Sequence, residues 1–149
     1  YQHIKKNDIP TIDEGNDVSI KVLVGKVKNT SSAVQTYSPV SIFDVQFTKP
    51  SLIDLDIPKN QTVMVYAIDG ELKFHEDNQI ARKGQMIYFD QSSDMINLTS
   101  ISPTGSYLVL AGEPLNESVV RYGPFVTNTE GDMKKAMLDY QNGKMGTLS

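Results

Sequence analysis

Few residues in this 149-residue chain are suited to metal or acid–base chemistry. The sequence has two histidines, His3 and His75, and no cysteine. A mononuclear non-haem iron site takes two or three imidazoles and a carboxylate that converge on one metal. We therefore expect neither histidine to be a ligand or an acid–base catalyst, and we expect His75 to be solvated. The lack of cysteine excludes disulfides, thiolate metal sites and thiol nucleophiles in this sequence.

Two pairs of carboxylates have the spacing of acid–base partners: Asp54 with Asp56, and Glu76 with Asp77. Asp54 and Asp56 alternate with apolar residues, so they project from the same face of one predicted strand. We expect this face to lie in water. The alternative is that it lines the cavity of a small β-barrel, because such barrels can enclose a ligand.

The sequence also lacks the short motifs of common enzyme classes. It contains no G-x-S-x-G elbow, no P-loop and no G-x-G-x-x-G fingerprint, and no serine and histidine are spaced as in a hydrolase triad. We therefore assign no catalytic residue and no metal ligand to this chain.

Charge and hydropathy exclude further classes of function. Fourteen basic and eighteen acidic residues give a net charge of −4 without a basic cluster, so direct nucleic-acid binding is not expected. No apolar run approaches the roughly 20 residues that span a bilayer, so a membrane role is not expected either. We expect the protein to be cytoplasmic.

Up to about residue 120, the chain reads as short strands without helices between them. Asp69 and Gly70 are expected to form a two-residue hairpin turn within one of these runs. The pattern predicts an all-β, antiparallel sandwich or barrel. The strand-like runs are 18–27, 41–48, 51–57, 62–74, 85–89, 95–101 and 106–112.

After residue 120, the apolar period changes from two to that of a helix. A helix is predicted over about 129–141, because Met133, Ala136, Met137 and Tyr140 fall on one face. Thr129 is its expected N-cap. We expect the apolar face of the helix to pack on the barrel, and the alternative is that it fills a groove of a partner. The segment 1–17 is polar and rich in turn formers, so it is interpreted as an edge segment or an interdomain connection, and 18–149 as one domain.

Residues 108–146, "LVLAGEPLNESVVRYGPFVTNTEGDMKKAMLDYQNGKMG", closely resemble the end of the pirin family. Members of that family finish with a strand, an A-G-x-P-L turn, Y-G-P-F-V-x-N-T and a helix that runs to D-Y-Q-x-G. Upstream, "VLVGKV", "SPV" at 38–40 and "FDVQF" resemble the opening strands of the family's C-terminal cupin. The resemblance implies a cupin-type double-stranded β-helix with one C-terminal helix over residues 18–149.

Pirins are bicupins whose N-terminal barrel holds a metal, usually iron, with three His and one Glu, whereas the C-terminal barrel has no metal. Several members are credited with quercetin 2,3-dioxygenase activity, and the animal proteins with iron-dependent transcription co-regulation. The P-H-x-H-x-G type metal motif has no counterpart here, since the segment before Asp69 and Gly70 reads "LDIPKNQTVMVYAIDGE" without an imidazole. The resemblance thus implies no cofactor in this chain, with iron or another divalent metal held by an upstream cupin.

Two functions follow from the resemblance. The favoured one is a metal-free C-terminal cupin that supports an absent metal-binding N-terminal cupin, because the sequence starts at Tyr1 rather than Met and its start reads as a connection. The longer protein would then be a metal-dependent dioxygenase or a redox or transcription co-regulator, and this chain alone would not be an enzyme. The alternative is a stand-alone metal-free cupin that binds a small molecule or a protein. The expected partners are thus the N-terminal cupin, a second copy of the chain or another protein. A C-terminal barrel without its N-terminal barrel should expose an apolar patch.

Two further sets of residues are singled out. Tyr122, Gly123, Pro124 and Phe125 are interpreted as a structural clasp between barrel and helix. Pro124 biases Gly123 towards extended backbone, and the two aromatic rings are expected to be buried.

If a ligand occupies the barrel, the wall of the ligand site would consist of residues at alternating strand positions. Three tyrosines are candidates for this wall, and packing in the core is the competing interpretation of their rings. The candidate ligand-binding residues are Tyr66, Tyr88 and Tyr107.

Overall fold

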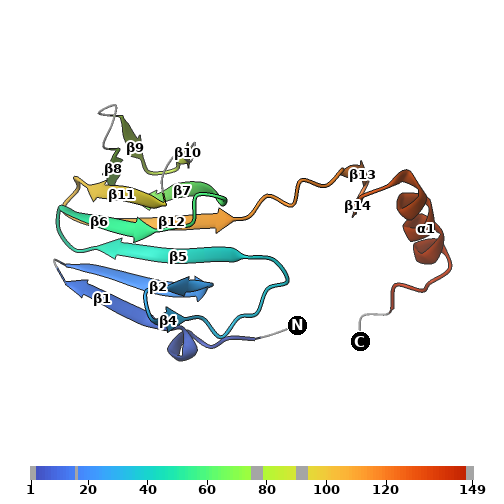
Figure 1. Ribbon diagram of the computed structural model, residues 1–149, viewed down its shortest axis with the longest axis horizontal. Coiled ribbons are helices and arrows are strands. Elements are labelled where there is room, and N and C mark those ends of the chain that lie inside the picture. The colour runs from blue at the N-terminus through green and yellow to red at the C-terminus, as the bar shows by residue number, and fades with distance from the viewer. Residues whose placement is uncertain (1–2, 16, 75–78, 90–93, 147–149) are drawn as a thin grey trace. The chain divides into compact units, whose positions relative to one another are not determined.

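The computed structural model describes residues 3–15, 17–74, 79–89 and 94–146. Contacts divide the chain into two compact units, Tyr1–Pro114 and Leu115–Ser149, and each has its own strands (Figure 1). No helix within the described residues is both long and apolar enough to cross a membrane.

Two antiparallel sheets form the first unit. The six-stranded sheet has the order β1 (Thr11–Gly15), β2 (Val18–Val24), β5 (Val40–Phe47), β12 (Gly105–Gly112), β7 (Thr62–Asp69) and β10 (Met86–Phe89). The four-stranded sheet has the order β6 (Ser51–Asp56), β11 (Met95–Ser100), β8 (Glu71–Lys73) and β9 (Ile80–Arg82). A short pair, β3 (Lys26–Val27) and β4 (Thr30–Ser31), and a 3-10 turn, Lys6–Asp8, complete this unit. Figure 1 shows β1, β2, β5, β12 and β7 following one another across the sheet.

The core comes from residues that alternate along these strands, as the period of two predicts. Phe43, Val45 and Phe47 of β5 are at most 2% exposed. On β6, Asp54 and Asp56 are exposed, whereas Ile53 and Leu55 are buried, so the expected solvated face is confirmed. The fold class is confirmed as well: antiparallel sheets with one C-terminal helix among the described residues.

The predicted hairpin at Asp69 and Gly70 is wrong. β7 pairs with β12 and β10, whereas β8 pairs with β11 and β9 in the other sheet. The chain therefore changes sheets at Gly70, whose φ of +84° is in the left-handed region. A Cβ at Gly70 would lie 2.7 Å from the carbonyl oxygen of Thr104, so only glycine fits this corner.

Segment 1–17 falls within the first unit and contributes a strand to it. β1 lies within it and forms the edge of the six-stranded sheet, where Thr11 pairs with Lys21 and Ile12 with Ile20. Of the two interpretations of this segment, the edge strand is therefore present in the structure.

The second unit consists of β13 (Val120–Tyr122), β14 (Phe125–Thr127) and α1 (Glu130–Gln141), which contacts both strands. α1 lies where the apolar period predicted a helix, and the Thr129 side chain accepts a hydrogen bond from the Asp132 amide as its N-cap. Met133 is the buried residue of α1. Packing of this helix on the barrel stays a prediction.

Candidate functional site

The outer face of the six-stranded sheet carries two rows of side chains that run across four strands. One row, in the order β5, β12, β7, β10, is Ile42, Leu110, Met64 and Tyr88. The next row in the same order is Asp44, Leu108, Tyr66 and Met86. These residues alternate with the buried ones, so they point away from the core. We call the seven apolar members of the two rows the outer patch: Ile42, Met64, Tyr66, Met86, Tyr88, Leu108 and Leu110.

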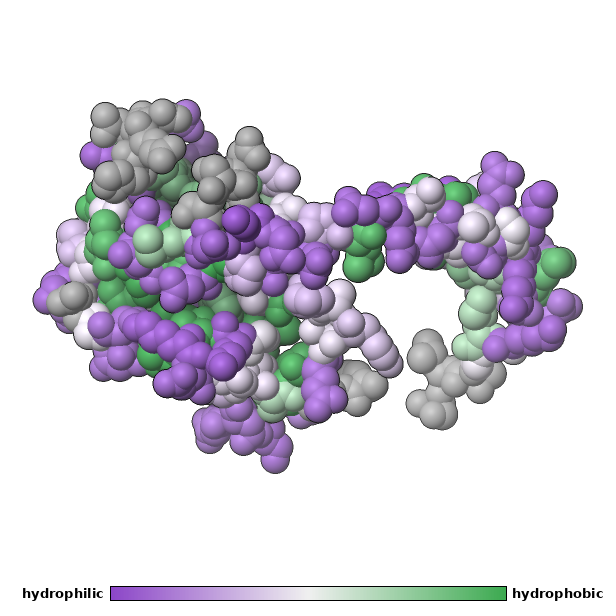
Figure 2. Space-filling view, viewed as in Figure 1, coloured by the Kyte–Doolittle hydropathy of each residue, from purple (hydrophilic) through white to green (hydrophobic). Residues whose placement is uncertain are grey.

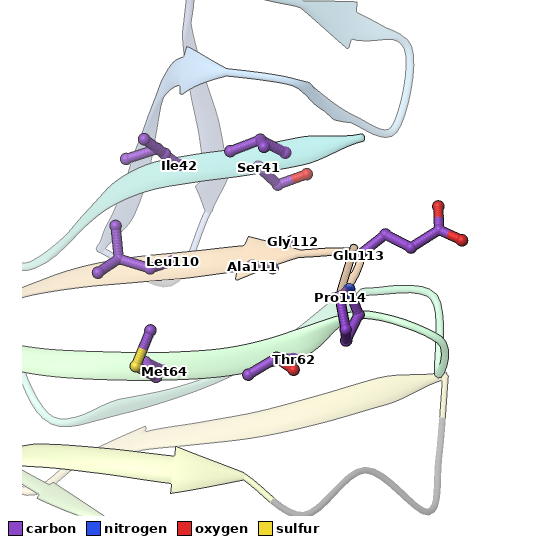
Figure 3. A pocket seen from close by; sticks show the side chains of 10 residues that line it. Ser41, Ile42, Thr62, Met64, Leu110, Ala111, Gly112, Glu113 and Pro114 are labelled. Atoms are coloured by element: carbon purple, nitrogen blue, oxygen red, sulfur yellow. The ribbon is translucent and has the colours of Figure 1, made fainter. Parts of the chain in front are cut away.

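A groove of about 300 Å³ lies at one end of the outer patch. Ile42, Leu110 and Met64 stand side by side on neighbouring strands along it (Figure 3). The next row along the face has smaller side chains. It consists of Val40 on β5, Gly112 on β12 and Thr62 on β7. The groove is hollow there since the row of large side chains ends, and its lining is mainly apolar.

The three candidate tyrosines do not share one wall. Tyr66 and Tyr88 belong to the outer patch and are 38% and 66% exposed. Tyr107 is fully buried between the sheets, where its ring packs edge to face on Phe47 at 5.6 Å. Ligand binding by these tyrosines stays a prediction.

The hydroxyl of Tyr107 is part of the corner where the chain changes sheets. It donates a hydrogen bond to the Glu71 carbonyl oxygen at 2.9 Å and shares another with the Ser100 hydroxyl at 3.1 Å. Burial raises the pKa of the Tyr107 phenol above its usual value, and the charges of Asp69 and Glu71 act in the same direction. The bond with Ser100 opposes this rise without reversing it.

The segment interpreted as a clasp forms a tight hairpin between β13 and β14. Gly123 has a φ of +54°, so the expectation of extended backbone at this residue is wrong. A left-handed first central residue is typical of the type II′ turn, which suits the twist of a two-residue hairpin. Within the second unit, Tyr122 is 62% exposed, and half-buried Phe125 stacks edge to face on Tyr140 at 5.7 Å. The role of this segment as a clasp between barrel and helix stays a prediction.

A second, polar pocket of about 340 Å³ is lined by Glu14, Lys28, Asp54 and Asp56, among others. Glu14 forms an ion pair with Lys28, and the Asn97 side chain donates a hydrogen bond to Asp54. No three metal-ligating side chains of the described residues come together as a candidate metal site. His3 is exposed, and His75, Glu76 and Asp77 lie outside the described residues.

The interior of the first unit does not fit a resident iron. A non-haem iron site takes imidazole and carboxylate ligands. The polar groups among the described buried side chains are the Gln61 amide and the Ser100 and Tyr107 hydroxyls, and hydrophobic side chains fill the rest of the core. These buried side chains include no imidazole and no carboxylate.

Two packed antiparallel sheets of this kind define an all-β protein of the cupin fold. A crystal structure of quercetin 2,3-dioxygenase from Acinetobacter baumannii superposes with a TM-score of 0.88 at 29% identity, over 100% of this chain and 51% of that one. The model of the pirin C-terminal cupin domain matches residues 42–146. The chain therefore belongs to the pirin C-terminal cupin domain family.

Curated relatives agree with this assignment. Pirin-1 of Arabidopsis thaliana is 32% identical over 149 residues, which are 98% of this chain and 52% of that protein. Pirin of Rattus norvegicus is 32% identical over 148 residues, 98% of this chain and 50% of that protein. The chain thus spans about half the length of the curated relatives it matches.

Sequence reasoning expected an apolar patch on a barrel without its mate but did not locate it, although a signal for the outer patch exists. In the runs 62–68 and 107–111 of β7 and β12, apolar residues occupy both alternating positions rather than one. Strands with this composition are typical of sheets that are covered on both faces.

Proposed function

We propose that this chain is a metal-free cupin domain that supports a metal-binding cupin in the same polypeptide. The observation that carries the proposal is the apolar interior, whose described buried residues include no histidine or carboxylate. The length of the relatives supports it, because a protein of about twice this length has room for a second barrel.

The longer protein would oxidise a flavonol such as quercetin, with iron or another divalent metal bound in its other half. This substrate class rests on the likeness to the Acinetobacter quercetin 2,3-dioxygenase. A redox or transcription co-regulator is the other role that the family resemblance implies. In either case, the present chain supplies packing surface, and its residues take no part in holding the metal. We place the protein in the cytoplasm.

The first experiment measures mass and metal content together. The polypeptide made by its own cell is expected to exceed 16.5 kDa and to hold about one metal per molecule, whereas the 149-residue chain alone should hold almost none. Quercetin consumption is then assayed for both, with activity expected for the longer protein only. Stoichiometric metal in the isolated chain, or a native mass of 16.5 kDa, would contradict the proposal.

A further inference from the structure

We infer that Asn142 and Gly143, the two residues after α1, form a deamidation site that the folded end of the helix keeps closed. Both residues are exposed. Apart from its chain neighbours, no heavy atom lies within 4 Å of the place that a Cβ on Gly143 would take. Glycine has no side chain and the widest range of backbone angles, so its amide nitrogen is the least hindered of all in attacking a preceding asparagine.

The chemistry of this site needs only the chain itself and water. The Gly143 amide loses its proton to hydroxide, and the nitrogen attacks Cγ of Asn142. The bond between Cγ and Nδ2 breaks, and the leaving group takes a proton from water and departs as ammonia. The two residues are then joined in a cyclic imide, which water opens at either carbonyl to give aspartate or isoaspartate at position 142. No electrons are transferred, so neither an oxidant nor a reductant takes part.

The end of α1 holds the attacking nitrogen in a hydrogen bond. The Gly143 amide donates to the Tyr140 carbonyl oxygen at 3.0 Å. The Lys144 amide donates to the Asp139 carbonyl oxygen at 2.8 Å. These two bonds, with Gly143 at a left-handed φ of +68°, are the Schellman motif that ends many helices. The nucleophile of the reaction is therefore the same nitrogen that closes the helix end.

The backbone of Asn142 also turns this nitrogen away from the side chain. Asn142 is the C-cap of α1, and its ψ is 7°. At a ψ near zero, the Gly143 nitrogen eclipses the backbone nitrogen of Asn142, whereas ring closure needs it close to Cβ. The chain must leave the cap conformation and break the Gly143 hydrogen bond before the reaction can begin.

The helix that carries this cap is short. α1 has 12 residues, and an isolated helix of this length is marginal in water. Helix ends and weakly packed elements open at a low cost in free energy. The rate of deamidation should therefore follow the fraction of time that the end of α1 is open.

The reaction marks this opening permanently. Its product adds a negative charge at the C-terminal end of the helix, where the macrodipole favours cations. The last turn of α1 has no basic residue to offset that charge. Isoaspartate also adds one carbon atom to the main chain, so the two bonds of the Schellman motif cannot both re-form. A chain that has reacted thus keeps an altered helix end.

Peptide mass spectrometry of the full-length polypeptide tests the site. Trypsin releases residues 136–144, in which Asn142 is the single asparagine. The polypeptide is incubated at mildly alkaline pH, folded and in urea, and deamidation is followed as the mass gained when the amide becomes a carboxyl group. We expect Asn142 to react roughly tenfold more slowly in the folded chain, as a closed population of about 90% would give. Methylation by an isoaspartyl carboxyl methyltransferase identifies the isoaspartate product.

Asn116 is an internal control in the same unit. It is exposed in a segment without helix or strand, but Glu117 rather than a glycine follows it. It should therefore stay unmodified over the same period, both folded and in urea. Exposure by itself would modify both asparagines.

A pair of variants at the other end of α1 tests whether the helix controls the rate. The Asp132 amide donates to the Thr129 hydroxyl at 3.1 Å, and Thr129→Ala removes this N-cap. Position 129 reaches Asn142 only through the stability of the helix between them. Thr129→Ala should therefore accelerate deamidation of Asn142 roughly fourfold, as the loss of one N-cap raises the open population. Thr129→Ser keeps the cap and should leave the rate unchanged.

Three outcomes would overturn the inference. Equal rates for Asn142 in the folded chain and in urea would refute the closed helix end. A rate in urea no higher than that of Asn116 would refute the site itself. An unchanged rate in Thr129→Ala, with α1 shown by hydrogen exchange to be weakened, would refute control by the helix. None of these outcomes depends on metal content or quercetin consumption, so each leaves the proposed function standing.

Discussion

Replacing Tyr107 by Phe tests whether this residue serves the fold rather than a ligand. The substitution keeps the buried ring and removes the hydroxyl at the corner between the sheets. Two hydrogen bonds are lost, to the Glu71 carbonyl at 2.9 Å and to the Ser100 hydroxyl at 3.1 Å. The carbonyl of Glu71 keeps its bond from the amide of Ile101 at 3.1 Å, so it retains a partner.

The expected loss in the free energy of unfolding is about 2 kcal/mol, since each neutral hydrogen bond contributes roughly 1 kcal/mol. No cavity contribution is added because the phenyl ring stays in place. For a domain of this size, the loss corresponds to a fall in Tm of about 4–8 °C.

Urea and thermal unfolding followed by circular dichroism measure this loss, and Ser100→Ala completes a double-mutant cycle. The coupling between the two positions should be about 1 kcal/mol, as for side chains in direct contact. Tyr88→Phe is the control, because Tyr88 is 66% exposed and its change should stay within about 0.5 kcal/mol. Equal Tm values for the Tyr107 variant and the wild-type chain would refute the structural role.

Further predictions concern two glycines, the N-cap of α1 and the stability of the fold at alkaline pH. Gly105→Ala should destabilise the fold by about 3 kcal/mol in urea unfolding, because its Cβ would lie 2.5 Å from the buried Tyr107 hydroxyl. Gly112→Ala should be nearly neutral in the same assay, since its nearest neighbour lies at 3.8 Å. Thr129→Ala should weaken α1 by about 1 kcal/mol, seen as faster amide hydrogen exchange, and Thr129→Ser should restore it. The pKa of Tyr107 is higher in the folded than in the unfolded chain, where it is near 10. The stability linked to this difference is therefore present below about pH 10 and is lost as the pH rises through the folded pKa. Tyr107→Phe should reduce this loss in unfolding curves measured at alkaline pH.

The sequence predicted buried strand faces well where only one face of a strand is apolar. In β5 and β6, charged or amide residues alternate with apolar ones, so the period of two identifies the inner face directly. In β7 and β12, apolar residues occupy both faces, and the pattern does not say which one is inner. This is why Tyr66 and Tyr107 were grouped together although they point to opposite sides of the sheet.

The error at Asp69 and Gly70 has a different physical origin. The dipeptide is typical of a two-residue type I′ hairpin, which needs positive φ at both residues, and only Gly70 has it. Strand pairing, however, is decided by contacts between residues that are far apart in the sequence. β7 pairs along its length with β12, which follows it by more than one strand in the chain. A local turn signal therefore predicts that the chain bends, without predicting which strand it will pair with.

The second unit buries little apolar surface of its own. It has only 35 residues, Leu115–Ser149, and Met133 is its one buried hydrophobic residue among those described. Figure 2 shows hydrophobic side chains of this unit among hydrophilic ones. Seven of its large hydrophobic side chains are exposed: Leu115, Val119, Tyr122, Val126, Leu138, Tyr140 and Met145. A unit this small, in a sequence without cysteine, does not bury enough apolar surface within itself to offset its conformational entropy. The packing of its helix on the barrel, which stays a prediction, would supply the apolar contact that the unit lacks by itself.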